Sequence, residues 1–63
     1  MKITNSHIWS AIRGMELMNK DDAQLSQIRD THTVSNAFAS RVIVLAVDQV
    51  RALRTIMQKG RAA

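Results

Sequence analysis

The sequence predicts an all-α protein, a helical hairpin made of one short and one long helix. The chain of 63 residues has no Pro and is rich in Ala, Met, Leu, Gln and Arg, which favour helix. Apolar residues recur at spacings of three and four through most of it. Strong turn chemistry is confined to residues 19–22, so two helices with one connection account for the pattern.

The length predicts a single domain, residues 1–63, that is marginally stable alone. A chain of this size buries only about 60% of its unfolded surface. It has no Cys, so disulfides cannot stabilise the fold. Of its residues, 46% are hydrophobic. Association with a second chain is the remaining way to stabilise so small a domain. We therefore expect the hairpin to dimerise into a helical bundle.

The first helix is expected over residues 5–19. Thr4, Asn5 or Ser6 offers a side-chain oxygen for the N-cap. The apolar face consists of Ile8, Ala11, Ile12, Met15 and Met18. Gly14 inside this helix predicts either a bend or the close approach of another helix, and we favour close approach.

The connection at residues 19–22 leads into a long helix, expected over residues 22–58. Asp21 and Gln24 have the spacing of a capping box. An inward register then continues in steps of three or four residues to Ile56. Residues 31–36 are weak helix formers, so a break there, with Ser35 or Asn36 capping a third helix, is the alternative to the continuous helix that we prefer.

The apolar run at residues 42–47 is the centre of the chain. Val and Ile in it also favour a buried strand, but no second strand is evident and the helical register continues past it. Its apolar residues point all round the helix, so we expect cover from a second copy, and a helix end at Gly60. The residues expected in the core or the dimer interface are Ile12, Met15, Leu25, Ile28, Phe38, Val42, Leu45, Leu53 and Ile56.

The net charge of +4 lies entirely in residues 41–63, since residues 1–40 carry equal numbers of basic and acidic side chains. Such asymmetry either indicates an anionic partner or complements the dipole at a helix C-terminus. The basic stripe, defined as Arg51, Arg54, Gln58 and Arg61, lies on one face of the long helix. It is expected to be solvated, to meet phosphates, or to meet an acidic protein.

Residues 25–44 resemble a helix-turn-helix. Thr33-Val34-Ser35, followed by Ala39, Ser40 and Val42, is similar to the turn and recognition helix of that class, although Thr33 stands where Gly is usual. The resemblance implies that Ile28, His32, Val34, Ala39 and Val42 pack. It also implies nucleic-acid contacts from Ser35, Asn36, Ser40 and Arg41, with Arg51, Arg54 and Arg61 as further partner contacts.

Catalytic, metal and cofactor sites are not expected. His7 and His32 are too few and too far apart for a metal site. Asp30, His32 and Ser35 have no spacing that brings them together, so we expect no enzyme activity. The N-terminal segment lacks the apolar block of a signal peptide, and the longest apolar run is far shorter than a membrane span, which indicates a soluble cytoplasmic protein.

The leading expectation for function is a small regulatory, adaptor or inhibitory protein that binds another protein as a homodimer, with no membrane and no small-molecule substrate. Binding of double-stranded DNA through residues 25–44 is the alternative. A structural subunit of a larger assembly is the second alternative. The first two differ in whether the chain binds duplex DNA at low salt.

Overall fold

The computed structural model describes residues 2–62, with side chains described through Gly60. It contains three α-helices and one short 3₁₀ helix, and no strand occurs in these residues. They are α1 (Asn5–Gly14), η1 (Leu17–Asn19), α2 (Asp22–Thr33) and α3 (Phe38–Ala62). The all-α prediction is confirmed, but the hairpin of two helices is wrong because the predicted long helix is divided in two.

α1 begins at the predicted N-cap residue, Thr4, whose backbone N–H donates to Nδ1 of His7 at 3.1 Å. It ends at Gly14, so the predicted extension to residue 19 is wrong. Glu16 turns the chain with a left-handed φ of 54°, and residues 17–19 form η1 instead. The close approach expected at Gly14 is also wrong, since nothing lies within 4 Å of where its Cβ would be.

The capping box predicted at the start of α2 is confirmed. The backbone N–H of Gln24 donates to Oδ1 of Asp21 at 2.8 Å, and the N–H of Asp21 donates to Oε1 of Gln24 at 3.0 Å. Two of the free donors at this helix end are therefore satisfied by side chains. This local chemistry fixes the boundary between η1 and α2.

The continuous helix over residues 22–58 is wrong, and the alternative break is present at residues 34–37. The hydroxyl of Thr33 donates to the carbonyl of Arg29 at 2.6 Å, and Oγ of Ser35 accepts from the N–H of Ala37 at 3.2 Å. The Ser35 bond offers the backbone an alternative to the helix, whereas Thr31 and Thr55 make the same bond as Thr33 inside continuing helices. The end expected at Gly60 is wrong as well, because α3 continues to Ala62 and Gly60 has no positive φ.

The core lies where α1, η1 and α2 meet the middle of α3. Its buried residues are Ile12, Leu17, Leu25, Ala46, Val47 and Val50, with Ile8, Ala11, Met15 and Ile28 packed around them. Of the other residues expected in the core or interface, Val42 is buried, and Phe38 and Leu53 are half-buried. Leu45 and Ile56 are exposed, because neither α1 nor α2 covers their side of α3.

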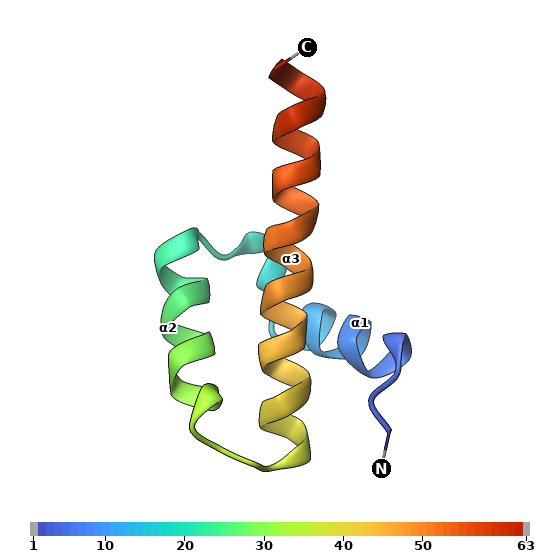
Figure 1. Ribbon diagram of the computed structural model, residues 1–63, viewed down its shortest axis with the longest axis vertical. Coiled ribbons are helices and arrows are strands. Elements are labelled where there is room, and N and C mark those ends of the chain that lie inside the picture. The colour runs from blue at the N-terminus through green and yellow to red at the C-terminus, as the bar shows by residue number, and fades with distance from the viewer. Residues whose placement is uncertain (1, 63) are drawn as a thin grey trace.

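α2 and α3 run antiparallel, side by side (Figure 1). Three polar contacts join them along the whole of α2: His32 with Ser40 at 3.0 Å, Arg29 with Asp48 at 2.9 Å, and Asp22 with Arg54 at 3.2 Å. A helix-turn-helix instead crosses its two helices at about 90–120°.

The packing positions that the helix-turn-helix resemblance implied are only partly occupied. Val42 is buried, and Ile28 and His32 are half-buried. Val34 is 88% exposed and Ala39 is exposed, so the resemblance was wrong about these two. The turn therefore does not hold the two helices through a buried Val34.

The molecule is elongated, because α3 extends past the other helices at its C-terminal end (Figure 1). Its extents are 40 × 23 × 17 Å. Its radius of gyration is 12.2 Å, against about 10.6 Å for a compact domain of this length. Its accessible surface is 4660 Å², against about 4,100 Å² for a compact monomer of 7.1 kDa.

Candidate interaction site

A groove lies at the α2–α3 turn, on the side of α3 that α1 leaves open. We call it the turn groove. It has a volume of about 310 Å³ and is open to solvent. Its walls come from the segment before α1, the end of α2, the turn and the start of α3: Ile3, Arg29, His32, Thr33, Ser35, Asn36, Arg41, Val44 and Leu45.

The polar side chains at the back of the turn groove hold the turn together. Nδ1 of His32 and Oγ of Ser40 are 3.0 Å apart, and Ser40 is only 9% exposed. The contact of Ser40 with a partner or nucleic acid stays a prediction, and in this structure its hydroxyl faces His32. Ser35, half-buried, binds the backbone of Ala37, while Asn36 remains exposed.

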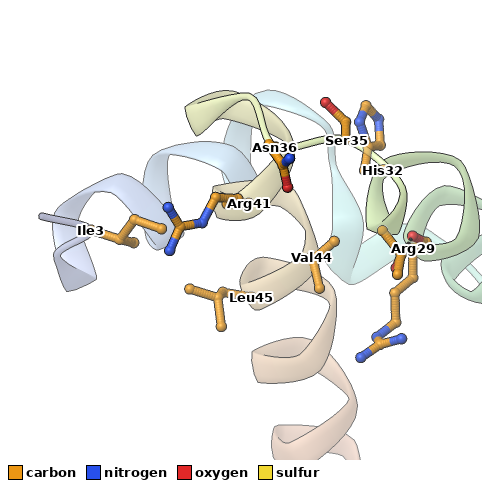
Figure 2. A pocket seen from close by; sticks show the side chains of 9 residues that line it. Ile3, Arg29, His32, Ser35, Asn36, Arg41, Val44 and Leu45 are labelled. Atoms are coloured by element: carbon orange, nitrogen blue, oxygen red, sulfur yellow. Dashed lines mark hydrogen bonds between the residues drawn. The ribbon is translucent and has the colours of Figure 1, made fainter. Parts of the chain in front are cut away.

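Two arginines flank the turn groove, and Figure 2 shows them on opposite sides of Val44. Nε of Arg29 donates to Oδ1 of Asp48 at 2.9 Å, which uses one edge of the guanidinium. Within residues 2–60, the side chain of Arg41 has no ion pair or hydrogen bond. No acidic residue lines the groove. The charge of Arg29 is offset by Asp48, so Arg41 carries the unpaired positive charge at the rim of the groove.

The floor of the turn groove is apolar. Val44 is half-buried and Leu45 is 42% exposed, and Ile3 lies beside Arg41 at one end (Figure 2). A groove with cationic ends and an apolar floor suits a ligand that combines negative charge with an apolar side chain.

The residues of the basic stripe differ in whether their side chains contact other parts of the protein. Arg51 is exposed, whereas Arg54 is half-buried and pairs with Asp22. The guanidinium of Arg54 also donates to the backbone carbonyls of Met18 and Lys20. The side chain of Arg61 lies outside the described residues. Arg54 therefore ties the α1–α2 connection to α3 and is not free to meet a phosphate.

The C-terminal end of α3 exposes large apolar side chains. Ile56 is 65% exposed and Met57 is 56% exposed, and Leu53 is half-buried one turn earlier. We call Leu53, Ile56 and Met57 the apolar end of α3. Their spacing places them on one side of the helix, beyond the part that α1 and η1 cover.

A second groove of about 310 Å³ separates α1 from the start of α3. Phe38 and His7 meet there edge to face, with ring centroids 5.2 Å apart. The remaining lining is almost entirely apolar and comes from Ser10, Ala11, Met15, Ala39, Val42 and Ile43. No charged rim gives this groove a selective chemistry.

Of the residues considered for catalysis or metal binding, His32 and Ser35 both line the turn groove, whereas Asp30 and His7 do not. His32 pairs with Ser40 and not with Ser35 or Asp30. Across residues 2–62, no three side chains of the metal-binding types gather closely enough to hold an ion. Within the same part of the chain, no helix combines the length and apolar character that crossing a bilayer requires.

The turn groove is the feature that sequence reasoning missed. A single helix that continued through residues 31–36 would hold Arg29 and Arg41 far apart along its axis, so the groove that they flank with Ile3 would not exist. The signal was present in the weak helix formers of that stretch.

No protein-family model matches this chain, and neither a curated protein nor a solved structure matches it.

Proposed function

We propose that this chain is a small non-enzymatic regulatory, adaptor or inhibitory protein that acts in the cytoplasm by protein–protein binding as a homodimer. The observation that carries the proposal is the apolar end of α3, which no other part of the described chain covers. Every residue from 55 to 60 is exposed.

A free helical end of this kind is weakly stable in isolation. Helices shorter than about 12–15 residues are marginal in water unless an apolar face is packed. The turns that extend past Arg54 continue a packed helix and need no nucleation of their own, but their largest apolar side chains, Ile56 and Met57, are exposed and add no packing. Packing those side chains against a partner gains hydrophobic free energy and stabilises the helix at the same time.

The surface area supports a partner of ordinary interface size. The accessible surface of 4660 Å² exceeds that of a compact monomer by about 600 Å². A standard interface buries about 800 Å² on each side. One such interface over the apolar end of α3 would therefore bury more area than the whole excess.

A second copy is the partner that fits this face best. Leu53, Ile56 and Met57 follow the spacing at which two helices interlock, so two copies present the same pattern to each other. Arg51 and Lys59 flank the pattern and are exposed. Because these like charges approach each other in the dimer, added salt should strengthen self-association.

Sedimentation velocity over a range of micromolar concentrations tests the proposal. We expect the wild-type protein to sediment as a dimer and Ile56→Glu to sediment as a folded monomer whose helical circular dichroism falls only by the contribution of the turns past Arg54. Val34→Glu is the matched control, because it also places an acid on an exposed apolar side chain, but at the turn. A folded wild-type monomer at these concentrations contradicts the homodimer.

Duplex DNA binding through residues 25–44 is the alternative function. The concentration of the net charge in residues 41–63, with Arg41 and Arg51 exposed, supports it. The antiparallel packing of α2 against α3 and the burial of Ser40 count against it. Titration with duplex DNA decides the question, because tight and steeply salt-dependent binding supports this alternative and no binding at low salt removes it.

A structural subunit of a larger assembly is the second alternative. The uncovered end of α3 also suits a repeated contact. The same sedimentation experiment separates this alternative from the dimer, because a subunit forms species larger than a dimer from the purified protein alone.

A further inference from the structure

We propose that the turn groove is the site that recognises the partner protein, and that its ligand is an acidic peptide segment with an apolar side chain between its acids. The inference rests on the proposed function, because it names the partner chemistry of a protein-binding protein. It uses a different surface from the dimer contact. Leu45 in the groove and Ile56 at the apolar end of α3 are about 16 Å apart along the helix axis.

The charges around the groove are complementary to an acidic ligand. Arg41 and Arg29 stand on opposite sides of Val44 (Figure 2), and no acid lines the groove. Arg41 is unpaired within residues 2–60, so a carboxylate gains a guanidinium partner without displacing one. Arg29 uses only Nε for Asp48, and its terminal amino groups have no partner among the described side chains. A carboxylate at one end of the groove therefore meets the unpaired Arg41, and a carboxylate at the other end meets an arginine that it shares with Asp48.

The floor of the groove requires an apolar contribution from the ligand. Val44 lies between the two arginines, with Leu45 on the Arg41 side of it and Ile3 beyond Arg41 at that end. A peptide with an apolar side chain between two acids covers these apolar side chains while its carboxylates reach the rim. A nucleic-acid backbone leaves them uncovered, and the groove has no aromatic side chain on which a base could stack. The combination therefore favours a peptide over a nucleic acid.

The probe for the test is a fluorescent, acetylated octapeptide in which glutamate alternates with leucine. We expect it to bind the wild-type protein and to bind less tightly as salt rises, which is opposite to the effect of salt on the dimer. A peptide in which lysine replaces each glutamate should not bind. If the lysine peptide or a short duplex DNA binds more tightly than the acidic peptide, the proposal is wrong.

Charge-reversal variants locate the site. Arg41→Glu should weaken binding of the acidic peptide about tenfold. Arg51→Glu is the matched control, since both arginines are exposed on α3 but only Arg41 lines the groove. Equal losses in the two variants overturn the site, because the attraction would then come from the net charge of α3.

A third variant predicts an effect of opposite sign. Asp48→Asn removes the negative charge beside the groove and frees Arg29, so binding should tighten about twofold. Weaker binding by this variant overturns the proposal. Sedimentation of the same samples separates the two proposals: a dimer that does not bind the peptide removes only this inference, and a monomer whose binding depends on Arg41 removes only the homodimer.

Discussion

Leu25 is the residue on which the attachment of α2 depends. It is the one fully buried side chain on α2, with 0% exposure, and it packs in the core with Ala46, Val47 and Val50 of α3. The polar contacts between α2 and α3 involve side chains that are mostly exposed, so they add little to stability. Leu25→Ala should therefore release α2 from α3.

The expected loss is large relative to the total stability. Replacing a fully buried Leu by Ala typically costs about 2–5 kcal/mol, because apolar contact is lost and a cavity remains. A domain of 63 residues is stabilised by about 3–9 kcal/mol in all. A loss of about 3 kcal/mol lowers the thermal midpoint of a domain this small by about 12–24 °C.

Thermal unfolding followed by circular dichroism measures this loss. All samples need one protomer concentration, because the midpoint of a self-associating protein depends on it. Val34→Ala is the control, since it also removes an apolar side chain but from a position 88% exposed. Its midpoint should stay within the change that about 0.5 kcal/mol produces.

Hydrogen exchange adds a local readout. In Leu25→Ala, the amides of α2 should exchange faster than those in the middle of α3, because α2 is the element released. If Leu25→Ala melts at the same temperature as Val34→Ala, the assignment of Leu25 to the core is refuted.

Further predictions concern the connections. Glu16→Gly should raise the free energy of unfolding by about 0.5–1 kcal/mol, because Gly accepts the left-handed φ of 54° without strain. Gly14→Ala should raise the free energy of unfolding by a similar amount, since the space around Gly14 is open. Urea unfolding measures both, and a loss in either contradicts the backbone argument. Asp21→Ala should cost about 1 kcal/mol through loss of the capping box, whereas Asp21→Asn keeps most of it; equal midpoints for the two would exclude a capping role. Arg54→Met should cost about 1 kcal/mol, while Arg51→Met should leave the thermal midpoint unchanged.

The parts of the fold that depend on neighbouring residues were predictable from the sequence. The helical class follows from composition and spacing, and the start of α2 follows from Asp21 and Gln24, whose side chains bond each other's backbone. These interactions span three residues, so the sequence contains all the information they require.

The parts of the fold that depend on competition between helical and alternative backbone conformations were not predictable. An inward helical register continues through residues 31–36, yet the N–H of Ser35 donates to the carbonyl of His32 and Oγ of Ser35 accepts from the N–H of Ala37, so the helical bonding pattern stops there. Gly14 was read as a close contact, although the turn after α1 is made by Glu16 in a conformation that Glu rarely adopts. The spacing of apolar residues does not report the difference in free energy between continuing a helix and ending it.

The candidate site was predicted least well, because it depends on the tertiary arrangement. Arg41 was expected at a partner surface and does line the turn groove, but Ser40 beside it is buried. Arg29 had no predicted role in a site, since only the break at residues 34–37 places it near Arg41. The charge of each residue was visible in the sequence, and its neighbours were not.

The three polar contacts between α2 and α3 join residues that are 8, 19 and 32 positions apart in the chain. Closing a loop becomes costlier with length, by about 1.2 kcal/mol between the shortest and the longest of these. The His32–Ser40 contact at the turn should therefore form first during folding, and the Asp22–Arg54 contact last. In stopped-flow experiments, Ser40→Ala should slow folding, whereas loss of the Arg54 contacts should mainly speed unfolding.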